Sequence, residues 1–206
     1  MPVYSKSSSP ATPVELEGLV KQARACHACV ARLPHSPRPI LRATRTARLL
    51  VVGQAPGRKV HETGIPWNDP SGDLLRDWLG LSREQFYDEN AIAIIPTGLC
   101  YPGSENGADL PPRPECAPLW HPSLRAAMQN IRLTLLIGRY AQAYYLGNRQ
   151  GRTLADTVRA YRDFLPDFFP LPHPSPRNRR WLKHNDWFGS EVLPMLNKWV
   201  DFALKQ

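Results

Sequence analysis

The sequence predicts an α/β domain in which helices cover a mostly parallel, four-stranded sheet. Four short apolar runs alternate with segments of helical periodicity and with Gly/Pro-rich loops. Such runs are typical of strands that are buried on both faces, and strands that alternate with helices indicate parallel pairing. We expect the 206-residue chain to form one domain, residues 14–206, after a polar, disordered tail at residues 1–13.

Each element follows from its local pattern. The apolar runs predict strands at residues 48–53, 91–95, 133–137 and 168–171. Helices are predicted at residues 14–26, 71–81, 116–129 and 153–164, after Gly138, and at residues 185–204 with a break before or at Pro194. Ser82 is expected to cap a further helix, with Gln85 in the capping-box position. Residues 33–45, 58–69 and 102–114 are expected to be loops.

The net charge and the composition of the chain indicate which kinds of partner and which compartment to expect. A net charge of +8 and an isoelectric point near 9.6 favour a polyanionic partner. The N-terminus lacks an apolar signal segment, and no apolar run reaches the length of about 18 residues that a membrane span needs. We therefore expect a cytoplasmic monomer that binds no membrane. In a reducing compartment, the four cysteines are expected to be ligands or buried thiols.

The first predicted strand ends in a Gly-Gln-Ala-Pro-Gly turn at residues 53–57. In an open α/β sheet, the loop at the carboxyl end of a strand commonly holds the ligand. Gly53 and Gly57 lack a Cβ, so backbone amides there can approach a flat ligand closely. The alternative is an ordinary turn between a strand and a helix.

The loop at residues 61–72 is expected at the same edge of the sheet. Trp67 could stack on a planar base, and Glu62 and Asp69 are titratable. The polar residues also have simpler interpretations, since Glu62 can be solvated and Asp69 or Ser71 can cap the next helix.

His173 follows the fourth predicted strand and stands between two prolines, which restrict its orientation. Such a histidine can donate a hydrogen bond to a developing oxyanion, and the Ser175 hydroxyl can meet a phosphate. A basic cluster with one tryptophan follows, as is typical of nucleic-acid contacts: Arg177, Arg179, Arg180, Trp181, Lys183 and His184. The alternative is a solvated helix start with a core tryptophan.

The cysteines form one close pair and two separated singles. Cys26 and Cys29 present two sulfurs to one metal, while Cys100 and Cys116 bracket a loop long enough to fold back on itself. Four thiolates suit a tetrahedral zinc ion or a [4Fe–4S] cluster. Spacing alone leaves open zinc, iron–sulfur, and two buried pairs without metal.

Together these motifs resemble the uracil-DNA glycosylase superfamily, most closely its iron–sulfur branch, family 4. That branch has a Gly-Glu-Ala-Pro-Gly motif after its first core strand, a Gly-x-Pro-Phe segment, and a second motif that begins His-Pro. This chain has Gly-Gln-Ala-Pro-Gly at residues 53–57, Gly-Ile-Pro-Trp at residues 64–67, and His173 followed by Pro174. The cluster cysteines of the family occupy the places of Cys26, Cys29, Cys100 and Cys116, so the resemblance favours [4Fe–4S] over zinc. It covers about residues 20–200.

The resemblance implies a three-layer α/β/α fold and a base-excision-repair glycosylase. Such an enzyme flips uracil, or a related deaminated base, out of single- or double-stranded DNA and hydrolyses its N-glycosidic bond. Trp67 would stack on the base, the backbone at Gly53, Gln54 and Ala55 would contact it, and His173 would stabilise charge on uracil O2. The implied DNA contacts are Ser175, Arg177, Asn178, Arg179, Arg180 and Lys183.

The chain departs from the family pattern at two places. Gln54 replaces the first-motif Glu, so we expect Asp69 or Glu62 to orient the attacking water. Residues 96–98, Pro-Thr-Gly, stand where the family carries the Asn that reads the uracil edge, which opens the pocket to another deaminated base. The alternative function is a glycosylase-fold module that binds nucleic acid with weak or no catalysis. A third interpretation is a zinc-stapled hydrolase that acts on a nucleotide.

Overall fold

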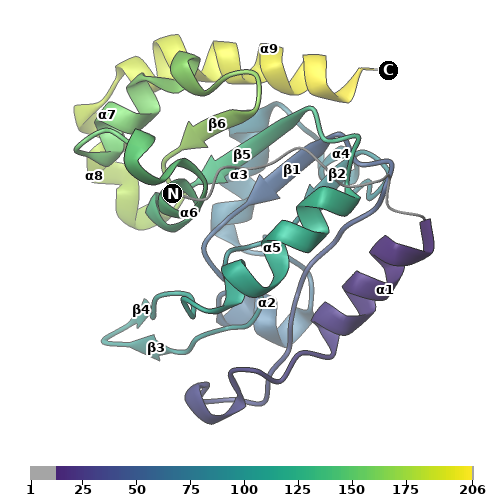
Figure 1. Ribbon diagram of the computed structural model, residues 1–206. Coiled ribbons are helices and arrows are strands. Elements are labelled where there is room, and N and C mark those ends of the chain that lie inside the picture. Colours follow the sequence, from purple (N-terminus) through teal and green to yellow (C-terminus); the bar gives the residue numbers. More distant parts are fainter. Residues whose placement is uncertain (1–12, 206) are drawn as a thin grey trace.

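The computed structural model describes residues 13–205 of the chain (Figure 1). Residues 1–12 of the expected tail lie outside the described residues, and Pro13 belongs to helix α1 (Pro13–Arg24) rather than to a tail. The central sheet has the strand order β2-β1-β5-β6 and is parallel throughout. Helices lie on both faces of this sheet, so the predicted α/β/α fold with a four-stranded sheet is confirmed.

The strands stand at the four predicted positions: β1 (Leu49–Val52), β2 (Ile92–Ile94), β5 (Leu133–Ile137) and β6 (Phe168–Leu171). Side chains of successive residues of β1 pack into hydrophobic cores on opposite faces of the sheet, because side chains alternate along a strand. Leu49 and Val51 pack on one face of the sheet, and Leu50 and Val52 pack on the other. Two covered faces explain why the strands are apolar without interruption.

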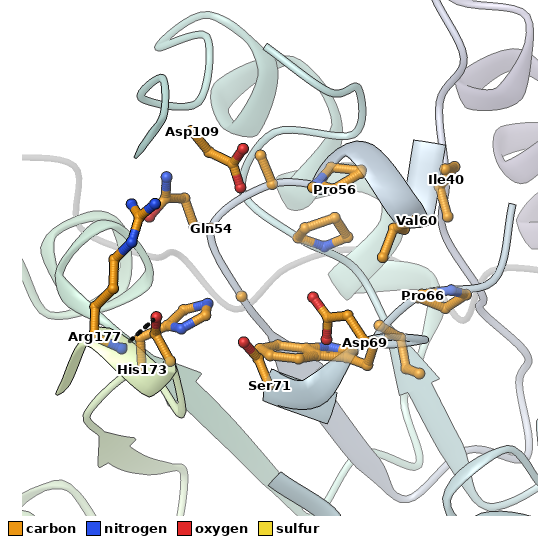
Figure 2. Close-up of a pocket in the computed structure, with 17 residues that line it drawn as sticks. Ile40, Gln54, Pro56, Val60, Pro66, Asp69, Ser71, Asp109, His173 and Arg177 are labelled. Carbon is orange, nitrogen blue, oxygen red and sulfur yellow. Dashed lines mark hydrogen bonds between the residues drawn. The ribbon is translucent and has the colours of Figure 1, made fainter. Parts of the chain in front are cut away.

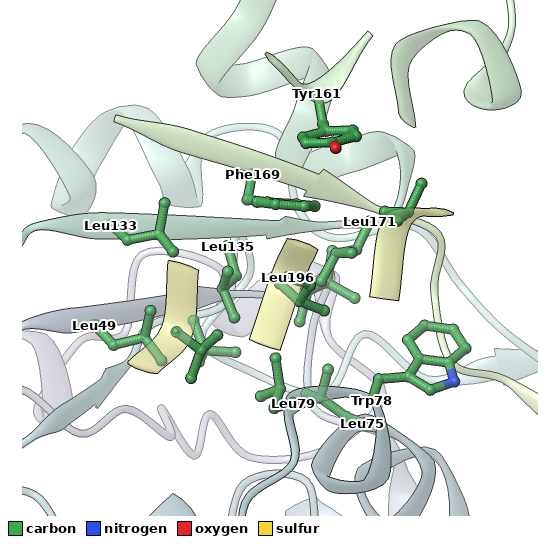
Figure 3. Packing of buried hydrophobic residues seen from close by; sticks show 14 of the residues in the cluster. Leu49, Leu75, Trp78, Leu79, Leu133, Leu135, Tyr161, Phe169, Leu171 and Leu196 are labelled. Carbon is green, nitrogen blue, oxygen red and sulfur yellow. The ribbon is translucent and has the colours of Figure 1, made fainter. Parts of the chain in front are cut away.

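One face of the sheet is covered by α3 (Pro70–Leu79), α7 (Leu154–Arg159) and α9 (Leu193–Leu204). Leu75 and Leu79 of α3 and Leu196 of α9 are buried against the strands (Figure 3). Burial of each such side chain contributes about 1.5–3 kcal/mol. The start of α3 is therefore held firmly beside the carboxyl end of β1.

The other face is covered by α1, α5 (Cys116–Ala127) and α6 (Arg139–Leu146). Leu16 of α1, Leu124 of α5 and Ala141 of α6 are buried in this second core. The first residue of α5 is Cys116, so packing of this helix also fixes one of the four cysteines.

Two segments that we expected to be loops contain regular structure. Residues 58–63 form α2 (Arg58–Thr63), and residues 104–109 form a hairpin of β3 (Ser104–Glu105) and β4 (Ala108–Asp109). Only Val60 of α2 is buried, so this helix has no apolar period for a sequence pattern to reveal. Asn106 and Gly107 turn the hairpin with positive φ angles of 49° and 72°, as a two-residue turn of this kind requires.

The other helix predictions have mixed outcomes. The capping box at Ser82 is confirmed at the start of α4 (Arg83–Phe86), where Ser82 and Gln85 each bond the backbone of the other. The helix predicted at residues 153–164 is interrupted, because α7 ends at Arg159 and a 3-10 turn follows it. The expected break near Pro194 is a π-helical turn at residues 188–192 that leads into α9. Within residues 13–205, no helix is long and apolar enough to cross a membrane.

Candidate active site

A pocket of about 260 Å³ opens at the carboxyl ends of the parallel strands (Figure 2). Its walls come from the loop after β1, from α2 and the start of α3, from the β3–β4 hairpin, and from the loop after β6. These segments are distant in sequence, and they meet because parallel strands place their carboxyl ends at one edge of the sheet. The pocket joins two of the loops singled out in the sequence, residues 61–72 and 173–178, to the turn at residues 53–57.

The turn at residues 53–57 is held in place by Thr97. The Thr97 hydroxyl donates to the carbonyl oxygens of Gln54, at 2.6 Å, and Gly53, at 3.2 Å. The Thr97 hydroxyl is therefore engaged in holding this turn. The amide N–H groups of Gln54 and Ala55 donate no hydrogen bond within residues 13–205, so they are available to a ligand.

The Gln54 side chain is tied to the segment that follows the hairpin. Its Nε2 donates to the carbonyl oxygen of Leu110 at 3.4 Å. An amide cannot accept a proton from water at neutral pH, so the first motif supplies no general base.

Trp67 packs tightly on two glycines. A Cβ on Gly53 would lie 2.8 Å from Cζ2 of the indole, and a Cβ on Gly72 would lie 1.8 Å from the Trp67 carbonyl oxygen. Trp67 itself has a φ of 57°, a left-handed conformation that is rare for a bulky residue and is found where the surroundings enforce it. Both glycines are therefore required for the indole to line the pocket.

His173 lies beside Trp67, with ring centroids 5.5 Å apart and an angle of 32° between the rings. Its backbone is fixed by Asn178, whose Nδ2 donates to the His173 carbonyl oxygen at 2.7 Å. Burial lowers the pKa of His173 below its usual value, and the nearby Asp69 carboxylate opposes this shift. The imidazole is therefore neutral at pH 7 and keeps one N–H to donate.

The two carboxylates expected to orient water lie in different surroundings. Asp69 lines the pocket, and its Oδ1 accepts a hydrogen bond from the Gly72 amide at 2.9 Å, so it caps α3 as well. Glu62 is exposed on α2 and is not among the residues that line the pocket. The role of Glu62 stays a prediction, and its position does not favour it.

The pocket lining contains a second carboxylate, which sequence reasoning missed. Asp109 ends β4 and lines the wall opposite Ser71 (Figure 2). The Asn106-Gly107 pair was the available signal, because it predicts a hairpin that would return the chain to the same edge of the sheet.

Basic residues surround the mouth of the pocket. Arg177 lines the pocket and donates to the Gly107 carbonyl oxygen at the tip of the hairpin, while Ser175 lines it from the same loop. Arg179, Arg180 and Lys183 are exposed on α8 (Arg179–His184). Trp181 packs against Trp187 and Phe188, so this tryptophan supports the core and does not project into solvent.

The four cysteines surround a second, smaller cavity of about 20 Å³, with Leu33, Pro37, Pro39 and Trp120 among its other walls. All four are free thiols. Burial raises the pKa of Cys100 to about 11 and that of Cys116 to about 12. The Leu99 amide donates to the Cys116 sulfur at 3.3 Å, a contact that suits a thiolate better than a thiol.

Four thiols are the donor set of either a tetrahedral zinc ion or an iron–sulfur cluster. Four sulfurs at about 2.3 Å from one zinc ion must lie about 4 Å from one another. Within residues 13–205, no group of three or more His, Cys, Asp or Glu side chains is arranged as a metal-ion site. The four cysteines line one mostly apolar cavity, so their sulfurs are the available donors for a metal centre.

A comparison with known protein families agrees with the fold. Residues 41–197 match the family described as the Uracil DNA glycosylase superfamily, and this range includes the turn after β1, Trp67, Asp109 and His173. Members of that superfamily generally bind DNA and hydrolyse N-glycosidic bonds. Since the match spans more than half of the chain, the protein belongs to the uracil-DNA glycosylase superfamily.

Proposed function

We propose that this protein is a DNA glycosylase that flips uracil, or a related deaminated base, out of DNA and hydrolyses its N-glycosidic bond in base excision repair. The observation that carries the proposal is that an aromatic platform, two ligand-free amides and a neutral histidine meet in one pocket. The groups are Trp67, the amides of Gln54 and Ala55, and His173.

The flipped base would enter the pocket with one face on Trp67. Stacking offsets part of the few kcal/mol that unstacking the base from DNA costs. The amides of Gln54 and Ala55 would donate hydrogen bonds to the base. The hydrogen bonds from the Thr97 hydroxyl to the backbone of this turn keep the amides in position. The tight packing of Trp67 on Gly53 fixes the platform before DNA binds.

His173 would stabilise the leaving base. As the bond between C1′ and N1 breaks, negative charge develops on the base, including its O2 oxygen. A neutral imidazole that donates one hydrogen bond to this oxygen is worth about 3–4 kcal/mol in comparable oxyanion sites. Asp69 approaches His173 closely enough to raise its pKa and would favour positive charge on the sugar or orient water.

The basic rim would hold the DNA backbone. Ser175 and Arg177 would contact phosphates next to the flipped nucleotide, and the exposed side chains of α8 would extend this contact along the strand. Asn178 is already bonded to the His173 carbonyl oxygen, so its contribution is to hold the catalytic loop.

We further propose that Cys26, Cys29, Cys100 and Cys116 hold a [4Fe–4S] cluster, with zinc as the less favoured occupant. The cavity that the four sulfurs line supports a metal centre, and the resemblance of the cysteine positions to the iron–sulfur branch favours the cluster over zinc. The cluster would have a structural role, because it would join the segment after α1 to the start of α5. Free thiols suit the reducing cytoplasm, in which the protein would act as a monomer.

A binding module with weak or no catalysis is the second candidate. Two observations favour it, namely that Gln54 supplies no carboxylate and that Thr97 is fully engaged with the turn it holds. Such a protein would bind damaged DNA but leave the glycosidic bond intact.

Incubation with oligonucleotides that contain uracil, hypoxanthine or xanthine, followed by alkali, separates the two candidates. A glycosylase leaves abasic sites that alkali converts to strand breaks. Single- and double-stranded substrates are tested in parallel, because the pocket does not distinguish them. Breaks at one or more deaminated bases support the enzyme, and DNA that binds yet stays intact with every base supports the module.

A further inference from the structure

Asp109 brings to the pocket the carboxylate that the first motif lacks. It lines the same cavity as Gln54 and His173 (Figure 2). Its Oδ2 would lie 3.3 Å from a Cβ placed on Gly57, so the carboxylate reaches over the turn after β1. The bond from Gln54 to the Leu110 carbonyl oxygen links this turn to the residue next to Asp109.

The Asp109 carboxylate is exposed at the end of β4, and no bond within the described part of the chain holds it in place. Within residues 13–205 it takes part in no hydrogen bond and no ion pair. Asp69, in contrast, uses one oxygen to cap α3. A pocket carboxylate without a partner in the fold has both oxygens available for water.

The charges around Asp109 are mixed. Asp109 is exposed at the end of β4, and its partial desolvation at the pocket wall raises its pKa above the usual value. Among the charged groups that face it, Arg177 and Arg58 lower this pKa, and Asp69 raises it. A carboxylate with a raised pKa holds a proton more readily than an ordinary Asp, which makes it a better general base near neutral pH.

We propose that Asp109 is a catalytic carboxylate that accepts a proton from the attacking water, which the amide of Gln54 cannot do. This inference rests on the proposed glycosylase activity. In the step, a bond forms between the water oxygen and C1′ while the bond between C1′ and N1 breaks. The electron pair of the broken bond leaves with the base, whose negative charge His173 stabilises. The water proton passes to Asp109 and then to solvent, and the base anion takes a proton from solvent.

Single-turnover excision by the full chain tests this role with Asp109→Asn. The variant keeps the shape of the side chain and loses its basicity, so we expect the excision rate at pH 7 to fall about 10²-fold, in line with other general bases. DNA affinity should stay within about threefold. Glu105→Gln is the matched control, because Glu105 is exposed on the same hairpin and does not line the pocket; its rate should be unchanged.

The pH dependence separates a catalytic role from a structural one. As the pH falls through the pKa of Asp109, the wild-type carboxylate becomes protonated, so the rate ratio of wild type to Asp109→Asn should shrink toward one. An active wild type with Asp109→Asn within about twofold, or with a ratio that does not change with pH, contradicts this inference alone. A wild type inactive on every base contradicts the proposed function and the role of Asp109 together.

Thermal unfolding provides a readout that does not depend on activity. Because the pKa of Asp109 is raised in the fold, the folded state holds this proton more tightly than the unfolded state. The free energy of unfolding therefore falls as the pH rises from the pKa of Asp109 in the unfolded state to its raised pKa in the folded state. Asp109→Asn should raise the unfolding midpoint at pH 7, with the gain lost below about pH 4, where the unfolded Asp is also protonated. A lower midpoint at pH 7 would assign Asp109 a structural role instead.

Discussion

The indole of Trp67 and the imidazole of His173 lie with their ring centroids 5.5 Å apart, although one residue precedes α3 and the other follows β6. Trp67 is fixed by contact with Gly53, and His173 by the bond from Asn178. The proposed stacking platform and the proposed hydrogen-bond donor are therefore positioned together in the unliganded protein. Such preorganisation is what stabilisation of a leaving group requires.

Replacement of His173 by Ala should reduce excision far more than binding. Removal of one preorganised donor from an oxyanion site costs about 10²–10³ in rate. Affinity is measured with DNA that carries a 2′-fluorinated uracil nucleotide, which resists cleavage, and should change by less than about fivefold. An equal loss of affinity and rate would show that His173 binds DNA and does not act on the leaving base.

Gly53→Ala should displace the indole of Trp67. The added Cβ would lie 2.8 Å from Cζ2, and such overpacking destabilises by about 1–3 kcal/mol. Both the unfolding midpoint and the excision rate should fall, and fluorescence of the six tryptophans should report the displaced ring.

Gly18→Ala is the control for this substitution. No atom outside the local helix lies within 4 Å of a Cβ at Gly18 in α1, so the change should leave excision intact and stabilise the helix by up to about 1 kcal/mol. Equal excision rates of the Gly53→Ala and Gly18→Ala proteins would show that Trp67 does not bind the base.

Lys183→Ala should weaken DNA binding uniformly across sequences. The affinity for DNA falls with salt, and the slope of log K against log salt concentration measures this dependence. Each lost phosphate contact reduces the magnitude of that slope by about one. Lys198, exposed on α9 and outside the pocket lining, provides the control. Fluorescence anisotropy over a salt series measures both slopes. A slope unchanged in Lys183→Ala would place the DNA path away from α8.

Cys116→Ser should abolish iron binding and lower the unfolding midpoint. Cys116 opens α5 and lines the small cavity with the other three cysteines, so loss of one ligand should release the cluster. Metal analysis and visible absorption of anaerobically purified protein check this result. A colourless wild type that contains one zinc ion per chain would contradict the iron–sulfur proposal.

Much of the fold could be predicted because strong local signals coincide with it. The four apolar runs correspond to the four strands, and the Ser82 capping box starts α4 as expected. The platform residue Trp67 and the histidine after β6 were found because each follows a strand or a glycine-rich motif at the edge of the sheet.

The remaining parts of the fold and of the candidate site depend on tertiary contacts that leave little pattern in the sequence. Helix α2 has one buried residue, and the β3–β4 hairpin is largely exposed, so neither shows hydrophobic periodicity. Asp109 was missed for this reason. Its position in the pocket results from the path of the hairpin, for which the Asn106-Gly107 pair is the local signal in the sequence.

The central claim is that this pocket releases a base from DNA. The most direct measurement is mass-spectrometric detection of the free base after wild-type protein, in excess, is mixed with uracil-containing single- and double-stranded DNA. We expect stoichiometric release of free uracil, or of another deaminated base when the DNA carries it, with release strongly reduced in His173→Ala. Recovery of intact DNA with no free base from any deaminated substrate would contradict the claim and identify the protein as a binding module.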